Sequence, residues 1–251
     1  MLSTRIYHIT HSKDYGICSL YFWGCNLDCR MCLLKKEAYD CHLPENRLRI
    51  YDSDYASPKP SRFLNFAKLT ELLSSLEIKS TFLMGAEPLQ DPSLPHVLVY
   101  LKFRQSRITL LTNGLKFPPV RRLDEIIFSI KAVSPDLHRD YTGRDNAAIL
   151  KNFRILARTE SVKLYAETVF IPDYVDEAEI IRIAEFIASV NSNIPFRIDA
   201  YLPVPGLSWR PPAAAEIESL AGEVKKILPL TTCFFGDRGN TPLAYEIERV
   251  Y

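Results

Sequence analysis

Short runs of β-branched, aliphatic and aromatic residues alternate with amphipathic stretches along most of this chain. Apolar residues between the runs recur at helical spacing, as in Phe66, Leu69, Leu73 and Leu76, which share one helix face. Neighbouring parallel strands need a crossover connection, so repeated β-then-α units favour a parallel sheet with helices outside it. The runs expected to form strands are 17–23, 81–84, 108–112, 126–130, 162–170, 196–201 and 232–235. Six or seven such units predict an α/β barrel, closed or incomplete.

The length and composition fit one barrel domain. The chain has 251 residues, of which 47% are hydrophobic and 24% charged, so a sizeable core can form without disulfides or metal staples. We expect a single domain over 1–251 with its core at about 14–236. The segment 41–61 is rich in Tyr, Asp, Ser and Pro and predicts an insertion before the first long helix.

The charge balance excludes partners that need a strong global field. Lys and Arg number 31 against 30 Asp and Glu, so the net charge of +1 favours neither nucleic acid nor an anionic membrane. The N-terminus has no apolar core of signal-peptide length, and no 18-residue apolar run occurs. We therefore expect a cytoplasmic protein with no membrane or evident nucleic-acid partner. Thiols stay reduced there, so the six cysteines indicate metal or redox chemistry rather than disulfides.

Three cysteines, Cys25, Cys29 and Cys32, form a C-x3-C-x2-C segment directly after the first predicted strand. A cubane [4Fe-4S] cluster is normally held by four thiolates, so three leave one iron open to an outside ligand. A structural zinc site is the alternative: Cys29 and Cys32, a pair at finger-like spacing, could form a Cys3His set with Cys41 and His42. The other cysteines have no partner spacing, so no second cluster is expected.

Polar and glycine-containing segments follow the next predicted strands. Residues 85–88 (Gly-Ala-Glu-Pro) follow the second, Asn113-Gly114 the third, and Lys131 the fourth. In parallel barrels the functional site is built at the carboxyl ends of the strands. These segments and the cysteines are therefore expected to meet at one end of the barrel.

In the combination of the cysteine segment with Gly85-Ala86-Glu87-Pro88, the chain resembles the radical S-adenosylmethionine (SAM) superfamily. The second segment is similar to the family's Gly-Gly-Glu-Pro motif, and a zinc site would not explain it. Within the superfamily the chain resembles the pyruvate formate-lyase activating enzyme group, through the segments 111–114, 128–131 and 170–173. This resemblance covers about 14–236 and implies a partial (β/α)6 TIM-like barrel.

The resemblance implies a [4Fe-4S] cluster and SAM as cofactors. The methionine part of SAM would chelate the open iron, and reductive cleavage would give a 5′-deoxyadenosyl radical that abstracts hydrogen from a substrate. It implies Cys25, Cys29 and Cys32 as cluster ligands. The residues expected to bind SAM are Met31, Gly85, Ala86, Glu87, Thr112, Ser129, Lys131 and Glu167.

Several of these residues have a plainer interpretation. Glu87 is expected to order its loop rather than to touch substrate, and Lys131 could be an ordinary surface lysine. Glu167 could face the lumen or form an exterior salt bridge. Asp199 and Tyr201, two apart on the sixth predicted strand, are candidates for contact with substrate or adenine. The loop around Trp209 could cover the mouth of the barrel, although a plain surface loop is the favoured interpretation. We assign no catalytic residue.

The chain also departs from the activating-enzyme pattern. Met31 stands where the group usually has an aromatic residue, and Leu111 and Ser129 replace two carboxylates of a reported monovalent-cation site. Three functions remain open: an activase for a glycyl-radical enzyme, a radical SAM enzyme acting on a small molecule, nucleoside or peptide, and a non-catalytic zinc-stabilised module. The resemblance implies a low-potential electron donor such as ferredoxin or flavodoxin.

Overall fold

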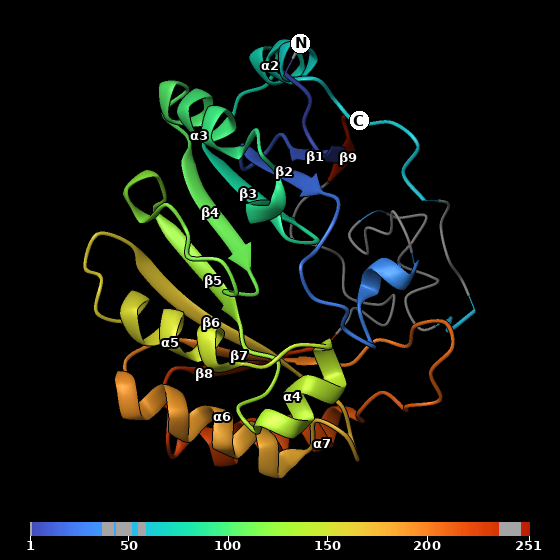
Figure 1. The fold of residues 1–251 in the computed structure, drawn as a ribbon, viewed down its shortest axis with the longest axis vertical. Coiled ribbons are helices and arrows are strands. Elements are labelled where there is room, and N and C mark those ends of the chain that lie inside the picture. The colour runs from blue at the N-terminus through green and yellow to red at the C-terminus, as the bar shows by residue number, and fades with distance from the viewer. Residues whose placement is uncertain (1, 37–42, 44–51, 55–58, 236–246) are drawn as a thin grey trace.

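The computed structural model describes residues 2–36, 43, 52–54, 59–235 and 247–251. These residues form one curved nine-stranded sheet in the order β8-β7-β6-β5-β4-β3-β2-β1-β9 (Figure 1). Strands β2 to β8 pair in parallel, while β1 and β9 extend the β2 edge with antiparallel pairing. The strands are β1 Ile6–Ser12, β2 Ile17–Phe22, β3 Ser80–Gly85, β4 Arg107–Thr112, β5 Glu125–Ser129, β6 Lys163–Phe170, β7 Phe196–Ala200, β8 Thr231–Phe234 and β9 Glu248–Arg249.

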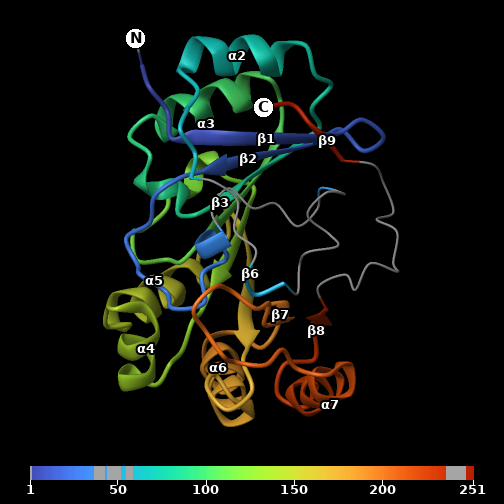
Figure 2. The ribbon, with the colours of Figure 1, turned by 90° about the vertical axis from the view of Figure 1, so that its right-hand side faces the viewer.

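The helices lie outside this sheet, with α2 and α3 beside one half and α4 to α7 beside the other (Figure 2). The α-helices are α2 Phe66–Ser74, α3 Leu94–Phe103, α4 Pro135–Thr142, α5 Ala147–Leu156, α6 Glu177–Val190 and α7 Ala214–Lys225. Short 3-10 turns occur at η1 Leu33–Lys36, η2 Pro88–Gln90 and η3 Val120–Arg122. The expected stripe on α2 is buried at Leu69 and Leu73, whereas Leu76 lies beyond the end of that helix.

Side chains alternate between the two faces of the sheet. In β6 every second residue from Leu164 to Phe170 is buried, whereas Glu167 and its same-face neighbours are only half-buried. Successive side chains of a strand point to opposite faces, so the fully buried set packs under the helices and the other set faces the lumen. The same alternation in β7 places Arg197 and Asp199 on the lumen side.

The helix α6 begins with a side-chain cap and also fixes α4. Asp176 accepts a hydrogen bond from the backbone N–H of Glu179, as its position before an apolar helix predicts. The Glu179 carboxylate does not reach back to the helix start. It is fully buried and accepts hydrogen bonds from the N–H groups of Val133 and Ser134, at the beginning of α4. One carboxylate thus joins two helices of the outer layer.

All seven strand predictions are confirmed, each within one residue at either end. The sheet also contains β1 and β9, which were not predicted and lie outside the expected 14–236 core. Most of the expected insertion at 41–61 falls outside the described residues. Among those described, no helix combines the length and apolar character needed to cross a membrane.

Candidate functional site

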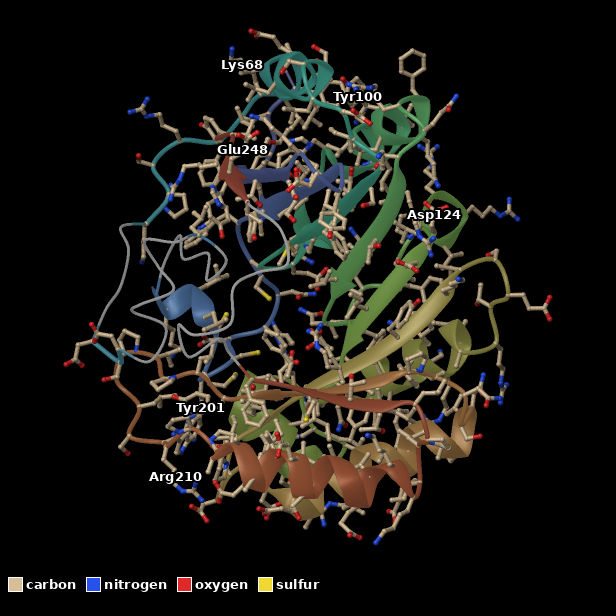
Figure 3. The ribbon with its side chains drawn as sticks, turned by 180° about the vertical axis from the view of Figure 1, so that it is seen from behind. Lys68, Tyr100, Asp124, Tyr201, Arg210 and Glu248 are labelled. Carbon is tan, nitrogen blue, oxygen red and sulfur yellow. The ribbon has the colours of Figure 1, made fainter. Side chains whose placement is uncertain are left out.

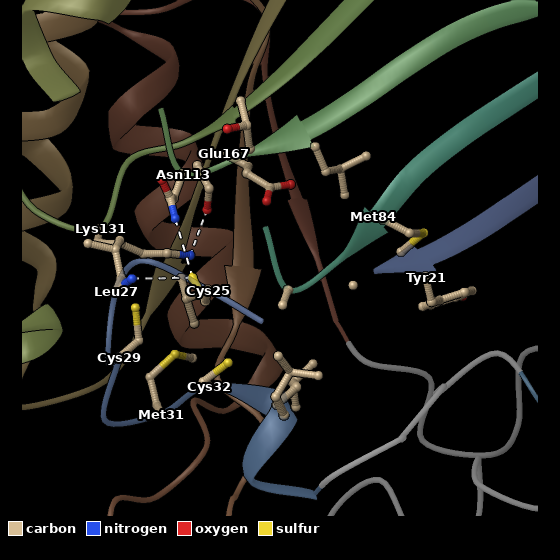
Figure 4. A pocket seen from close by; sticks show the side chains of 18 of the residues that line it. Tyr21, Cys25, Leu27, Cys29, Met31, Cys32, Met84, Asn113, Lys131 and Glu167 are labelled. Atoms are coloured by element: carbon tan, nitrogen blue, oxygen red, sulfur yellow. Dashed lines mark hydrogen bonds between the residues drawn. The ribbon is translucent and has the colours of Figure 1, made fainter. Parts of the chain in front are cut away.

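A cavity opens at the carboxyl end of the parallel strands (Figure 4). All three cysteines of the C-x3-C-x2-C segment line it, together with segments that follow β3, β4 and β5. The expected residues that line it are Cys25, Cys29, Met31, Cys32, Gly85, Ala86, Thr112, Ser129, Lys131, Glu167 and Asp199. Glu87 and Tyr201 do not. Most of the candidate residues therefore meet at the carboxyl ends of the strands, as predicted.

The cysteine loop leaves β2 and is fixed against the C-terminal end of α4. The backbone N–H of Asp28 donates to the carbonyl of Thr142, and that of Arg30 to the carbonyl of Tyr141, both at 2.9 Å. Such backbone bonds between segments more than 100 residues apart hold the loop in one conformation. The cysteines sit on a braced loop.

The three thiols are free and differ in exposure. Cys25 is exposed, while Cys29 and Cys32 are half-buried. Burial raises the pKa of the Cys29 thiol to about 12, against the opposing effect of the nearby Lys131 ammonium. Burial likewise raises the pKa of Cys25 and Cys32. A bound metal overrides this, because a coordinating thiol is deprotonated outright.

The donor set suits an iron–sulfur cluster by its chemistry. Soft thiolates select iron–sulfur clusters or zinc, and three on one loop are the ligand number that leaves a cubane iron open. Among the described residues, no three His, Cys, Asp or Glu side chains converge as ligands of a single ion would. The thiolates of a cubane bind three different irons and need not converge on one point. Cys41 and His42, the remaining ligands of the zinc alternative, lie outside the described residues.

Glu87 is buried behind the cavity wall and organises the loop after β3. Its carboxylate accepts hydrogen bonds from the N–H groups of Leu89 at 3.1 Å and Asn113 at 2.8 Å, and from the Thr112 hydroxyl at 3.0 Å. Burial raises the pKa of Glu87, and these hydrogen bonds act in the opposite direction. These contacts are those of a residue that orders its loop. The Thr112 hydroxyl donates its hydrogen to this carboxylate.

A glycine is required at position 85 because the backbones of β3 and β2 lie very close together there. Its φ of +99° is rare for residues with a side chain, and a Cβ there would lie 2.7 Å from the carbonyl oxygen of Phe22. The close approach is therefore between β3 and β2, not between Gly85 and a ligand. Ala86, the departure from the second glycine of the motif, donates its N–H to the same Phe22 carbonyl at 2.9 Å.

Asn113 is a cavity residue that the sequence analysis did not select. Its side-chain amide donates to the carbonyl of the Asn26 side chain at 2.8 Å and lies 3.4 Å from the Cys25 sulfur. The signal was its position directly after the third predicted strand, beside Gly114. It connects the end of β4 to the cysteine loop.

Lys131 and Ser129 form a pair at the end of β5. The Lys131 ammonium donates to the Ser129 hydroxyl at 2.7 Å, and both side chains line the cavity. The surface-lysine interpretation is therefore wrong. A cation at this position can attract an anionic ligand group or cysteine thiolates.

Three charged side chains on β6 and β7 form an ion cluster on the lumen side of the sheet, and two of them, Glu167 and Asp199, line the cavity. Arg197 on β7 donates to Glu167 at 2.8 Å and to Asp199 at 2.6 and 2.9 Å. Glu167 thus faces the lumen and forms its salt bridge there, so the interpretation as an exterior salt bridge is wrong. Burial, followed by the charge of Glu167, raises the pKa of Asp199 to about 6.

The expectation for Tyr201 is wrong, because β7 ends at Ala200. Tyr201 has left the strand, its ring is fully buried, and its hydroxyl accepts a hydrogen bond from the N–H of Val204 at 3.4 Å (Figure 3). It lies against Trp209, with ring centroids 6.0 Å apart.

The loop around Trp209 is not a plain surface loop. The Trp209 ring stacks on Tyr174 with centroids 4.1 Å apart, and the Arg30 guanidinium lies 5.2 Å from the Trp209 centroid. Arg30 stands between Cys29 and Cys32 and also pairs with Asp140 on α4 at 2.8 Å. The loop after β7 is thereby attached to the cysteine loop.

The chain is similar to known proteins. The sequence profile described as the radical SAM superfamily matches residues 21–187. The chain is 26% identical over 200 residues to a protein of Methanocaldococcus jannaschii that bears the name of a glycyl-radical enzyme activating enzyme, covering 77% of this chain and 71% of that one. It is 34% identical over 113 residues to the isethionate sulfite-lyase activating enzyme of Desulfovibrio desulfuricans, covering 42% and 36%.

The fold also matches a solved structure. SuiB of Streptococcus suis, solved bound to S-adenosylmethionine, superposes with a TM-score of 0.62 at 15% identity. The match covers 84% of this chain and 48% of SuiB, so the chain spans about half the length of that protein. At this identity the likeness shows a shared fold.

Proposed function

The chain belongs to the radical SAM superfamily, and we propose that it is an activating enzyme that generates a glycyl radical on a partner protein. The superfamily uses a [4Fe-4S] cluster and SAM, so the chain is an enzyme of this chemistry. When bound, the cluster supplies one electron that breaks the C5′–S bond of SAM, giving methionine and a 5′-deoxyadenosyl radical that takes hydrogen from a substrate.

In this proposal Cys25, Cys29 and Cys32 hold the cluster. Their free thiols, their shared loop and their position at the cavity support it. The extent of the family match, which continues to residue 187, supports iron–sulfur ligation over a local zinc site.

The cavity walls then hold SAM. Lys131 is suited to its carboxylate, since the ammonium lies in the cavity beside the hydroxyl of Ser129. Met31, 7% exposed, offers an apolar thioether side chain for the adenine. Gly85 and Ala86 present backbone to the cavity, and Glu167 can take a ribose hydroxyl or a substrate amine. Glu87 acts behind these groups by holding the loop, and Thr112, which lines the cavity, donates a hydrogen bond to its carboxylate.

The similarity to two proteins named as activating enzymes carries the activase proposal. The partner would be a glycyl-radical enzyme, and the electron would come from a low-potential carrier such as ferredoxin or flavodoxin. The free, closely spaced thiols suit a reducing cytoplasm.

The cluster assignment is tested first, by anaerobic reconstitution. Wild-type protein should bind about four irons and turn brown, and replacement of any one of Cys25, Cys29 and Cys32 by Ala should lower the iron content sharply. Cys233→Ser is the matched control, because this free cysteine lies on β8 and does not line the cavity. Stoichiometric zinc without colour would overturn the assignment.

The activase proposal is tested with the glycyl-radical enzyme encoded nearest to this gene. Reduced enzyme, SAM and that partner should give a doublet EPR signal, and partner protein labelled with α-deuterated glycine should transfer deuterium to 5′-deoxyadenosine. The Cys25→Ala enzyme is the control and should give neither. Absence of both signals with wild-type enzyme that cleaves SAM would contradict the activase role.

A second candidate is modification of a small molecule, nucleoside or peptide. It is supported by Leu111 and Ser129 in the cavity wall, where the activating-enzyme pattern has carboxylates. Transfer of deuterium from labelled metabolites into 5′-deoxyadenosine, without transfer from a partner protein, would favour it.

A further inference from the structure

Tyr141 lies next to the cysteine loop, in the last turn of α4. Its carbonyl accepts the hydrogen bond from the backbone N–H of Arg30 at 2.9 Å, and Arg30 stands between Cys29 and Cys32. The ring packs edge-on against Tyr174, with centroids 5.8 Å apart. Both the main chain and the ring of Tyr141 are therefore fixed beside the proposed cluster ligands.

The hydroxyl group of Tyr141 is buried and unpaired. The residue is 1% exposed, and the described residues offer its hydroxyl no hydrogen-bond partner. The neighbouring tyrosines differ in this respect: the Tyr174 hydroxyl donates to Asp140, and that of Tyr201 accepts from Val204. A buried polar group without a partner is unfavourable, so nearly all such groups in proteins have one.

The surroundings of this hydroxyl indicate what the partner is. After burial, the charges of Cys29 and Cys32 contribute most to raising the pKa of Tyr141, ahead of those of Tyr174 and Tyr201. The backbone gives the geometry: the N–H groups of Asp28 and Arg30, on either side of Cys29, donate to the carbonyls of Thr142 and Tyr141, which holds Cys29 against the end of α4 that carries Tyr141. A cluster bound by Cys29 and Cys32 would give this hydroxyl a thiolate or sulfide acceptor. Such an anionic sulfur accepts a hydrogen bond more strongly than a neutral thiol does.

We propose that the Tyr141 hydroxyl donates a hydrogen bond to the [4Fe-4S] cluster, at the Cys29 or Cys32 thiolate or an adjoining sulfide, and thereby raises its reduction potential. The proposal rests on the cluster ligation proposed above. One-electron reduction adds negative charge to the cluster, so a donor to its sulfurs stabilises the reduced state more than the oxidised state. Tyr141 would make reduction by the electron donor easier without touching substrate.

The direct test is the reduction potential of cluster-loaded Tyr141→Phe, measured by EPR-monitored redox titration without SAM. The variant should be harder to reduce, by about tenfold in the equilibrium constant, which is 59 mV for one electron. Tyr174→Phe is the matched control: it removes a hydroxyl from the same ring cluster, but one that is bonded to Asp140, and should leave the potential unchanged. An unchanged potential in Tyr141→Phe, or an equal shift in both variants, would overturn the proposal.

A second readout does not depend on the potential. Deuteron ENDOR of the reduced cluster in D2O should show an exchangeable site that is lost in Tyr141→Phe and kept in Tyr174→Phe. If Tyr141→Phe binds less iron than wild type, 3-fluorotyrosine placed at position 141 keeps the shape and makes the phenol a stronger donor. Its cluster should be easier to reduce than that of wild type, and an unchanged potential would refute the inference. Failure of wild type itself to load a cluster would instead refute the ligation on which the inference rests.

Discussion

The carboxylate of Glu87 accepts a hydrogen bond from the backbone N–H of Asn113 across 2.8 Å, which ties the loop after β3 to the end of β4. The side chain of Asn113 continues this connection, because its amide bonds Asn26 and lies 3.4 Å from the Cys25 sulfur. A single buried carboxylate thus supports the cavity wall from behind and, through Asn113, the first cysteine.

Replacing Glu87 by Gln should therefore destabilise the protein. The two carboxylate oxygens receive different N–H groups, that of Leu89 at one oxygen and that of Asn113 at the other. An amide can accept only one of these bonds and turns its own N–H2 toward the other donor. We expect a loss of about 2 kcal/mol in the free energy of unfolding, measured with urea on the metal-free protein.

Weaker SAM binding by cluster-loaded Glu87→Gln should accompany this loss. Glu71→Gln on the exposed face of α2, beside Lys68, is the control and should change stability by less than about 0.5 kcal/mol (Figure 3). Equal stability of both variants would show that the Glu87 bonds contribute little.

Two glycine-to-alanine substitutions should change the free energy of unfolding in opposite directions. Gly85→Ala places a methyl group 2.7 Å from the Phe22 carbonyl oxygen at a φ of +99°, so we expect a loss of about 3 kcal/mol. Gly222→Ala, within α7, meets no atom within 4 Å and should stabilise the protein by about 0.5–1 kcal/mol. Thermal and urea unfolding measure both. Tolerance of Gly85→Ala would mean that β2 and β3 can separate at this end of the sheet.

Trp209→Ala should expose the cysteine loop. The ring links the loop after β7 to Tyr174 and Arg30, and without it these segments lose their stacking and cation–π contacts. We expect the visible absorbance of the loaded cluster to bleach severalfold faster in air. Arg210→Gln, which alters the next residue and its pairing with Glu216, should bleach at the wild-type rate. Equal rates in all three proteins would show that this loop does not shield the cluster.

The sequence predicts the repeating part of this fold well and the exceptions poorly. The parallel strands are continuous or alternating apolar runs that lie between helices. The period of the apolar residues and the spacing between the runs therefore locate these strands. Strand β1 has polar residues such as His8 and Thr10 on a fully buried strand and joins β2 through a hairpin rather than a crossover. Strand β9 has only two residues, too few for a pattern.

The same distinction holds at the site. The cysteines and strand-end segments are contiguous in sequence, so motif and position find them. Asn113 and Tyr141 act through contacts with residues about 90 and 110 positions away, which no local pattern encodes. Tyr201 was misplaced because the strand ends one residue earlier than its aromatic and aliphatic run suggests.

Asp199 should make stability depend on pH in a way that Asp199→Asn removes. Burial and the charge of Glu167 raise its pKa from 3.8 to about 6, while Arg197 and Lys131 act to lower it. Between these values the folded protein binds more protons than the unfolded chain, so the free energy of unfolding falls as the pH rises through this window. Relative to wild type, Asp199→Asn should therefore gain stability from about pH 4 to pH 6, on the order of 2 kcal/mol, and gain no more above it.

Urea unfolding of the metal-free proteins at several pH values measures this difference. Glu216→Gln is the control, because the Arg210 guanidinium lowers the pKa of this carboxyl to about 2. Its ionic contribution is present above the ordinary pKa of glutamate and is lost only in more acidic solution, so its curve should run parallel to that of wild type from about pH 5 upward. If the Asp199→Asn curve also ran parallel to wild type, Asp199 would be ionised at its ordinary pKa, and the cations of Arg197 and Lys131 would be enough to balance the carboxylates of Glu167 and Asp199.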